Sequence, residues 1–297
     1  MSMDISIIIV NYNTCRVTID ALQTVFASHT LFRYEVILID NYSSDDSVRI
    51  IRELYPDVIL IENQENVGFS RANNQGIRIA KGRYVLLLNS DTLIMQDTLE
   101  TMVHFMDRHP DVGASGCKVL LPDGSLDKTC KRGFPTPLNS FYYLSGFAKL
   151  FPRNPRFNQY TMSHLDPDQE TPIDSLVGAF MMVRRETFEQ VGLLDEAFFM
   201  YGEDIDWCYR IKQAGWQIYY YPRTHILHLK GASSRKKPLK ITYEFHRAMI
   251  LFHRKHYHGI YPWPVNITVY VAIYLKLLFE IVYNRIRFYL ISTRGIR

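Results

Sequence analysis

The sequence predicts an α/β fold in which a mainly parallel, Rossmann-like sheet is flanked by helices and followed by a C-terminal helical extension. Two observations predict the sheet: short apolar runs alternate with amphipathic segments, and the connections between them are short. The third observation is the length, since 297 residues suit one α/β domain of roughly 200–250 residues plus a further segment. We therefore expect a main domain over residues 1–234 and an extension over residues 235–297.

Each expected element has its own signal. Continuous apolar runs, typical of strands buried on both faces, occupy residues 5–10, 34–40, 58–61 and 84–88, and later runs predict strands at 175–183 and 217–221. Helices are expected at 48–54, 70–81, 98–108 and 204–214, after capping side chains at 43–46 and before Gly82, Pro110 and Gly215. Between 122 and 172, seven prolines interrupt short helical pieces, which we interpret as a long excursion from the sheet.

Composition excludes several classes of protein. The apolar fraction of 47% and the charged fraction of 22% are ordinary globular values, which argues against disorder. The four cysteines form no CxxC pair, which argues against a disulfide scaffold or zinc ribbon and fits a reducing compartment. No charged segment followed by an apolar one opens the sequence, so we expect no secretory signal.

Charge is distributed unevenly along the chain. Residues 235–297 hold 12 Lys and Arg against 2 acidic residues, whereas residues 1–234 hold 22 against 28. A basic end on a mildly acidic body predicts contact with an anionic surface, with membrane phospholipid favoured over nucleic acid.

Polar residues follow three of the predicted strands, as Asn11-Tyr12-Asn13, Asp40-Asn41 and Asn89-Ser90-Asp91. The carboxyl ends of parallel strands share one edge, where ligands bind. A carboxylate such as Asp91 suits Mg²⁺ or Mn²⁺ when phosphates supply the other ligands, and Asp40 suits a nucleobase imide N–H. The alternative for both is capping of the following helix, which the Asn89–Asp91 tripeptide alone would favour.

A second acidic group begins the predicted helix at 204–214. Glu203, Asp204 and Asp206 follow the aromatic run at 198–202, and carboxylates beside partly dry aromatic surface have pKa values suited to proton abstraction. The alternative is stabilisation of the helix N-terminus. His228 follows the last predicted strand. A lone histidine is usually structural, but a candidate metal carboxylate elsewhere in the chain favours a ligand role.

Taken in order over residues 4–234, these motifs resemble the family 2 glycosyltransferases of the GT-A fold, particularly bacterial rhamnosyltransferase-like members that build surface polysaccharides. The matching segments are 7–13, 36–41, 65–70, 73–76, 87–91, 122–126, 178–183, 198–210 and 228–233. Many motifs in the right order are far more specific than any one of them.

The resemblance implies roles for individual residues. Val10, Asn11 and Tyr12 would border the nucleobase with Asp40 bonded to its imide; Asn66, Phe69 and Asn73 would line the donor side; Arg71 would reach phosphate. Asn89, Ser90 and Asp91 form the DxD-type motif, here with Asn first, so that Asp91 and His228 would hold Mn²⁺ or Mg²⁺. Asp204 matches the general base, Glu203 and Asp206 would orient it or the acceptor, and Arg132 and Trp207 would lie on the acceptor side.

The implied reaction is an inverting transfer of a sugar from a nucleotide-diphospho-sugar, dTDP- or UDP-linked, to a glycan or polyprenyl-diphosphate-linked hydroxyl. A sugar nucleotidyltransferase is the first alternative, but it would need a glycine-rich phosphate loop, and residues 10–13 contain no glycine. A non-catalytic nucleotide- or nucleic-acid-binding protein is the second. Because no recognisable nucleic-acid-binding module is present, we expect no nucleic-acid partner.

The apolar run at 265–291 is long enough to span a bilayer, but Lys276 and Glu280 interrupt it. On a helix, Thr268, Lys276, Glu280, Asn284 and Arg287 form a polar stripe, and Tyr270, Tyr274, Tyr283, Phe288 and Tyr289 suit a headgroup boundary. Together with nearby Arg235, Lys236, Lys237, Arg254, Lys255 and Arg294, this pattern favours an in-plane membrane helix of a cytoplasmic enzyme at the inner face of the cell membrane. The alternative is a helix hairpin packed on the protein or on a second copy in a homodimer.

Overall fold

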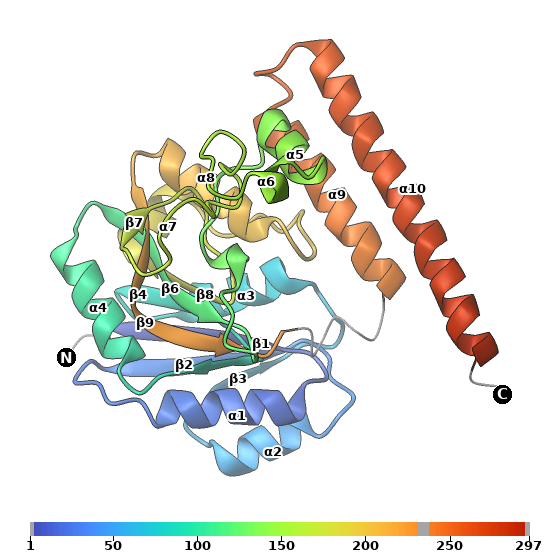
Figure 1. Cartoon of the computed structure of the whole chain (residues 1–297). Helices are drawn as coiled ribbons and strands as arrows, with labels where there is room; N and C mark the ends of the chain where they lie inside the picture. Colours follow the sequence, from blue (N-terminus) through green and yellow to red (C-terminus); the bar gives the residue numbers. More distant parts are fainter. Residues whose placement is uncertain (1–2, 231–237, 295–297) are drawn as a thin grey trace.

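The computed structural model describes residues 3–230 and 238–294. The first part of the chain alternates strands and helices: β1 (Ile5–Asn11), α1 (Cys15–Phe26), β2 (Tyr34–Asp40), α2 (Ser47–Leu54), β3 (Ile59–Glu62), α3 (Phe69–Ile79) and β4 (Tyr84–Asn89). Then follow β5 (Thr92–Ile94), α4 (Thr98–Arg108), β6 (Val112–Leu120), α5 (Pro137–Leu144), α6 (Phe147–Leu150), β7 (Thr171–Pro172), β8 (Phe180–Arg184), α7 (Arg185–Val191), α8 (Glu203–Gln213) and β9 (Gln217–His228). The helices cover both faces of one sheet (Figure 1).

The first four long strands form the parallel part of the sheet, in the order β3-β2-β1-β4. Asn11 lies opposite Asp40 in the β1–β2 register, and Val10 lies opposite Asn89 in the β1–β4 register. The polar residues that end these strands therefore share one edge, as the sequence predicts.

The second half of the sheet is mixed rather than mainly parallel. Strand β8 runs antiparallel to both β4 and β6, while β6 and β9 are parallel. The chain leaves β6 at the carboxyl edge, makes its excursion over residues 121–179, and re-enters the sheet from that same edge, so β8 has to run in the opposite direction. Within the excursion, the short helices α5 and α6 match the predicted helical pieces.

Several element boundaries differ from the prediction. Helix α3 ends at Ile79, and Gly82 is not a left-handed cap: a Cβ there would lie 2.5 Å from the backbone nitrogen of Ser6, so this position needs glycine for close packing. Gly215 does adopt the left-handed conformation, with φ +92°. Strand β9 continues to His228 because a register shift after Cys117 leaves the proline-containing stretch 222–224 unpaired with β6.

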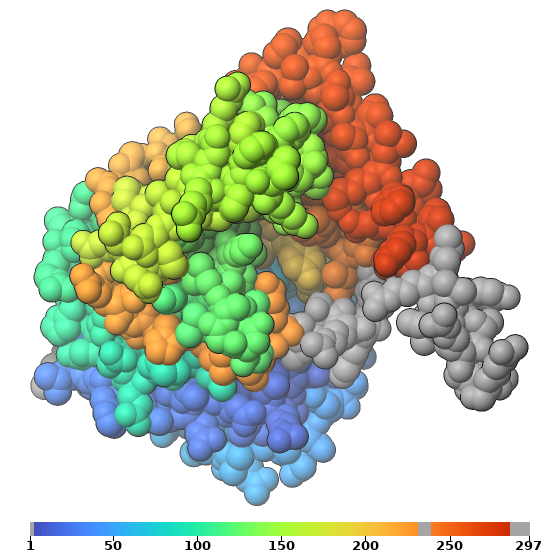
Figure 2. All heavy atoms as spheres, in the orientation of Figure 1, coloured from blue at the N-terminus to red at the C-terminus, as the bar shows by residue number. Residues whose placement is uncertain are grey.

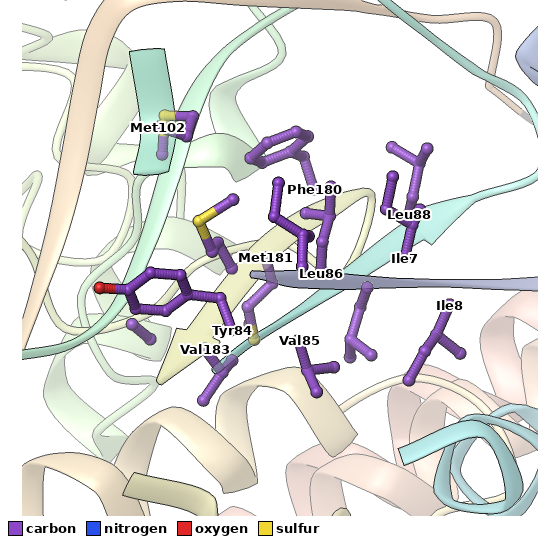
Figure 3. Packing of buried hydrophobic residues seen from close by; sticks show 14 of the residues in the cluster. Ile7, Ile8, Tyr84, Val85, Leu86, Leu88, Met102, Phe180, Met181 and Val183 are labelled. Carbon is purple, nitrogen blue, oxygen red and sulfur yellow. The ribbon is translucent and has the colours of Figure 1, made fainter. Parts of the chain in front are cut away.

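The main core lies on both faces of β1, β4 and β8. Figure 3 shows Ile7, Leu86 and Leu88 on one side of these strands and Ile8 and Val85 on the other, as strand alternation requires. Burial on both faces explains why these strands read as continuous apolar runs.

The extension is a hairpin of two helices, α9 (Pro238–His256) and α10 (Trp263–Arg294), beside the α/β body (Figure 1). Ala248 and Phe252 of α9 and Tyr257 just after it form a second core with Phe198, and Tyr209 is among the residues packed against it. Helix α10 packs on α9, and two residues of the expected polar stripe face α9: Lys276 lies over the ring of Phe245, and Glu280 approaches His246 at 4.0 Å, whereas Thr268 of the same stripe is exposed.

The outer face of α10 is apolar. Its exposed residues include Ile267, Val271, Tyr274, Leu275, Leu278, Phe279, Val282 and Tyr283. Within the described residues one helical stretch, Trp263–Arg285, is long and apolar enough to cross a membrane by length and composition, with mean hydropathy 1.8 and 11% of it buried. The basic residues Arg235, Lys236 and Lys237, and the side chains of Arg287, Phe288, Tyr289 and Arg294, lie outside what is described.

Candidate active site

The ends of β1 and β2 are joined by buried side chains. The amide of Asn11 donates to Asp40 Oδ1 at 2.7 Å, and Asp40 Oδ2 accepts from the backbone of Ser43 at 2.8 Å. The hydroxyls of Thr14 and Thr18 both donate to Asn11 Oδ1 at 2.8 Å. Asp40 is thus fixed in place at the edge of the sheet, beside the half-buried Val10 and Tyr12.

Residues 63–69 form the next part of this edge. Asn66 Oδ1 accepts hydrogen bonds from the backbone of Gly68 and from the amide of Asn41, both at 3.0 Å, and Gly68 has φ +89°. The buried Asn73 donates back to the carbonyl of Phe69 at 2.9 Å, which fixes the start of α3.

The prediction that Arg71 reaches phosphate finds no support in its position. Its Nε lies 3.8 Å from Glu196, on the face of α3 that also carries Arg78, whose guanidinium donates to the same carboxylate at 2.8 Å. Since residues three and seven apart on a helix share a face, Arg71 faces the segment before α8.

Asp91 and His228 meet where β5 pairs with β9. Asp91 Oδ1 lies 3.2 Å from His228 Nε2, and the amide of Asn89 lies 3.5 Å from the same nitrogen. Both Asp91 and His228 are buried, and the backbone of Leu229 donates to the carbonyl of Asp91 at 2.9 Å. Ser90 is held through its hydroxyl, 3.2 Å from that of Thr14.

This donor set fits a divalent cation whose remaining ligands come from a diphosphate. Two ligands of one metal ion lie about 3 Å apart, and carboxylate oxygen with imidazole nitrogen suits Mn²⁺ or Mg²⁺. Asn89 Oδ1 is buried without a hydrogen-bond partner among the described residues. Across residues 3–230 and 238–294, no three His, Cys, Asp or Glu side chains gather as a metal site, so the protein would supply two ligands rather than a full cage.

The local charge also favours a cation. Burial alone would lower the pKa of His228, but the carboxylates of Asp127 and Asp91, which face its two ring nitrogens, outweigh burial and raise the pKa to about 9. The two carboxylates that flank His228 offer a negative field to a cation.

Asp204 begins α8 and is held on several sides. Its Oδ2 accepts from Arg132 at 2.6 Å and from the backbone of Gly178 at 3.3 Å, and its Oδ1 accepts from the backbone of Ile205 at 2.8 Å. Arg132 is buried and also donates to the carbonyl of Leu176. Arg132 was expected on the acceptor side; the structure adds a direct ion pair with the candidate base.

Glu203 lies next to this pair, buried, with Oε2 unpartnered among the described residues. Burial, helped by the charge of Asp204, raises the pKa of Glu203 to about 8. This environment favours the protonated, neutral form of the Glu203 carboxyl beside Asp204.

A dipeptide, Gly178-Ala179, connects the base to the metal motif. Gly178 donates its N–H to Asp204, and the carbonyl of Ala179 accepts from the backbone of Asn89 at 3.2 Å. A Cβ on Gly178 would lie 3.7 Å from the ring of Phe69, so the donor-side phenylalanine packs at the same point. The space-filling view shows a recess on this face, beneath the lobe of residues 137–150 (Figure 2).

Two predicted site residues face elsewhere. Trp207 is fully buried in the main core and donates through its indole N–H to the carbonyl of Gly192 at 2.9 Å, so it cannot contact an acceptor. Asp206 is fully buried and faces α9, where it pairs with Lys255 and His256 at 2.7 Å and with Arg210 at 2.9 Å. It anchors the hairpin rather than orienting the base.

The mixed sheet, with carboxylates at the carboxyl edge of its parallel part and an antiparallel β8 beside β4, agrees with the GT-A glycosyltransferase fold that the sequence motifs indicate. Comparison with known families agrees, because the profile of "Glycosyl transferase family 2" matches residues 6–192, more than half of the chain. The chain belongs to this family and is a glycosyltransferase. A second profile, "N-terminal domain of galactosyltransferase", matches residues 159–232.

Curated relatives include bacterial rhamnosyltransferases. The N-acetylglucosaminyl-diphospho-decaprenol L-rhamnosyltransferase of Mycobacterium tuberculosis is 29% identical over 252 residues, 81% of each chain. Rhamnosyltransferase WbbL of Escherichia coli K12 is 29% identical over 177 residues, which cover 57% of this chain and 63% of that protein.

Solved structures support the fold. The mannosyltransferase PcManGT from Pyrobaculum calidifontis, in complex with GDP-Man and Mn²⁺, matches with TM-score 0.57 and 19% identity over 93% of this chain and 70% of its own. Residues 1–349 of TarS from S. aureus match with TM-score 0.57 and 16% identity over 94% of this chain and 72% of that one.

Proposed function

We propose that this glycosyltransferase moves a sugar, with inversion, from dTDP-rhamnose or a UDP-hexose to a hydroxyl of a glycan or polyprenyl-diphosphate-linked acceptor in bacterial surface polysaccharide synthesis. Relatives named as rhamnosyltransferases support the sugar, and one of them, named for a diphospho-decaprenol substrate, supports the lipid-linked acceptor.

One observation carries the proposal: the candidate base and the candidate metal motif are hydrogen-bonded to two adjacent residues. Asp204 accepts a hydrogen bond from the backbone of Gly178, and the backbone of Asn89 donates one to the carbonyl of Ala179. Two residues after Asn89, Asp91 lies 3.2 Å from His228. A base and a leaving-group site have to lie within one substrate length of each other, and this connection supports such an arrangement.

Each group then has a role in a single displacement. Asp91 and His228 would hold Mn²⁺ or Mg²⁺, which supplies charge stabilisation for the departing nucleoside diphosphate. Asp204 accepts the proton of the acceptor hydroxyl while that oxygen attacks the anomeric carbon from the face opposite the diphosphate. The bond to the diphosphate breaks, so the anomeric configuration inverts. Arg132 and the backbone of Gly178 fix the orientation of the Asp204 carboxylate.

We also propose that the enzyme is cytoplasmic and rests on the inner face of the cell membrane through α10. The exposed apolar face of this helix, including Leu275 and Phe279, supports this placement, since it offers apolar area to the acyl boundary. A lipid-linked acceptor would then be presented in the same plane. A homodimer through the same face is the alternative.

Activity is tested with a panel of dTDP- and UDP-sugars and a bacterial membrane extract, by following label into lipid-linked product. Asp204→Asn should bind donor normally but lose transfer, because an amide cannot accept the proton; normal turnover would remove Asp204 from the base role. Asp195→Asn, away from the base in the loop before α8, is the matched control and should retain transfer.

Metal use is tested by thermal unfolding. UDP or dTDP together with Mn²⁺ should raise the melting temperature of the wild type, and Asp91→Ala should abolish that rise. An equal rise in the variant would place the metal elsewhere.

A further inference from the structure

Asp127 lies directly behind His228, on the side opposite Asp91. Its Oδ2 is 3.6 Å from His228 Nδ1, while His228 Nε2 faces Asp91 Oδ1 at 3.2 Å. His228 is therefore bracketed by two carboxylates, one on each ring nitrogen. The sequence motif at 122–126 stops one residue short of Asp127, and none of the roles above involves this side chain.

The position of Asp127 is rigidly fixed. Its backbone N–H donates to the carbonyl of Val119 at 2.8 Å, and its Oδ1 accepts from both the backbone and the hydroxyl of Thr129, at 3.0 and 2.7 Å. The remaining oxygen, Oδ2, accepts from Lys230 at 3.0 Å and faces the imidazole. Only 2% of the residue is exposed, so the carboxylate is held in place without solvent.

His228 Nδ1, in turn, is buried and lacks a hydrogen-bond partner among the described residues. A small approach of the ring toward Asp127 would close the 3.6 Å gap to an ordinary hydrogen bond. Metal-binding histidines usually donate their second ring N–H to a carboxylate, which fixes the tautomer and turns the other nitrogen toward the metal.

We propose that Asp127 is a positioning residue of the metal site. It accepts a hydrogen bond from the Nδ1–H group of His228, and this bond directs Nε2 of the same ring toward the cation beside Asp91. This inference rests on the proposed metal-assisted function. Asp127 acts from behind the imidazole and is not itself a ligand, which agrees with the lack of a three-residue metal cluster in the described part of the chain. Lys230 balances its charge from the solvent side.

Mn²⁺ affinity provides the first test, measured from the EPR signal of free Mn²⁺ at saturating UDP and, in parallel, at saturating dTDP. Asp127→Asn keeps an oxygen for Thr129 but removes the charge facing His228, and should weaken Mn²⁺ binding about 10- to 100-fold. The matched control is Asp123→Asn in the same loop, where the exposed carboxylate accepts from the backbone and the hydroxyl of Ser125 in its own turn. It should bind Mn²⁺ as the wild type does.

Two results would overturn the role of Asp127 and leave the proposed function intact. In the first, Asp127→Asn binds Mn²⁺ within twofold of the wild type. In the second, it loses Mn²⁺ binding as completely as Asp91→Ala, which would make Asp127 a ligand. A wild type that binds no Mn²⁺ with either nucleotide would overturn the metal part of the proposed function as well.

Imidazole NMR of the wild type provides a second test that needs no folded Asp127 variant. With Mg²⁺ and nucleotide bound, histidine-labelled protein should show His228 as the Nδ1–H tautomer, with assignment by comparison with His228→Gln. The opposite tautomer, Nε2–H, would contradict a metal-facing Nε2 and overturn the proposal.

Discussion

Replacing Asp206 by asparagine should detach the C-terminal hairpin from the helix that carries the candidate base. Asp206 is fully buried and receives two cationic groups, Arg210 from its own helix and Lys255 from α9, and a hydrogen bond from His256. Asparagine has nearly the same shape, so the substitution removes the charge without opening a cavity. The N–H groups of the asparagine amide would instead face the N–H donors that Asp206 now accepts from.

The expected loss can be worked from the carboxyl pKa. Burial alone would raise it, but hydrogen bonds from His256 and Lys255 and the charge of Arg210 lower it from 3.8 to about 2. That difference corresponds to ~2.5 kcal/mol of folding free energy at neutral pH, and breaking one side of a buried ion pair typically costs about 3–5 kcal/mol. We expect Asp206→Asn to lose about 2–4 kcal/mol.

Urea unfolding of the full chain at pH 7 measures this loss, and the buried Trp207 reports on α8 by fluorescence. Asp195→Asn is the matched control, because Asp195 also pairs with Lys255, at 2.6 Å, but is 29% exposed. Exposed pairs contribute about 0–1 kcal/mol. The control should therefore stay within 1 kcal/mol of the wild type.

The pH dependence has a definite sign. Because the folded pKa lies below the unfolded value, Asp206 stabilises the protein fully above about pH 4, and this contribution disappears as pH falls toward 2. The gap between wild type and Asp206→Asn should be constant from pH 7 to 5 and shrink below 4. Equal losses for the two variants at pH 7, or a gap unchanged by acid, would refute the reasoning.

Three further predictions concern other parts of the molecule. The pKa of Glu203 is raised to about 8, whereas the same carboxyl in the unfolded chain loses its proton near pH 4. In thermal unfolding, Glu203→Gln should therefore gain stability relative to the wild type as the pH rises from 5 to 8.5. A stability difference that stays constant over this range would contradict the protonation of Glu203. Gly82→Ala should lose about 2 kcal/mol or more of folding free energy in urea unfolding, because the added Cβ would collide with the backbone of Ser6. Gly259→Ala should be neutral in the same measurement, because its Cβ would meet nothing within 4 Å. Leu275→Glu with Phe279→Glu, at positions 61% and 68% exposed, should abolish cosedimentation with anionic vesicles without changing stability; retained binding would exclude this face.

The parallel half of the fold follows from the sequence because burial on both faces leaves a direct signature. Strand β6 shows no continuous apolar run, because its sequence, VGASGCKVL, is rich in small residues. The structure gives the reason: a Cβ on Gly113 would meet Trp216 at 2.8 Å, and one on Gly116 would meet Leu176 at 2.5 Å. Packing against neighbouring elements requires small residues here, and it overrides strand propensity.

The candidate site was predictable where a residue type and a strand end coincide, as for Asp40 and Asp91. It was not predictable where the direction of a side chain decides the role. Trp207 and Asp206 stand in the same motif as Asp204, yet one enters the core and the other faces α9. The α9 partners of Asp206, Lys255 and His256, lie about 50 residues further along the chain, so no local pattern could indicate them.

Helix geometry explains how α8 serves both the site and the hairpin. Residues two apart on a helix point about 200° apart, so Asp204 faces Arg132 and Gly178 while Asp206 faces the opposite way, toward Lys255 and His256. A single turn of α8 therefore lies between the candidate base and α9, and α9 in turn supports the apolar face of α10. The extension therefore contacts the same turn of α8 that carries the candidate base.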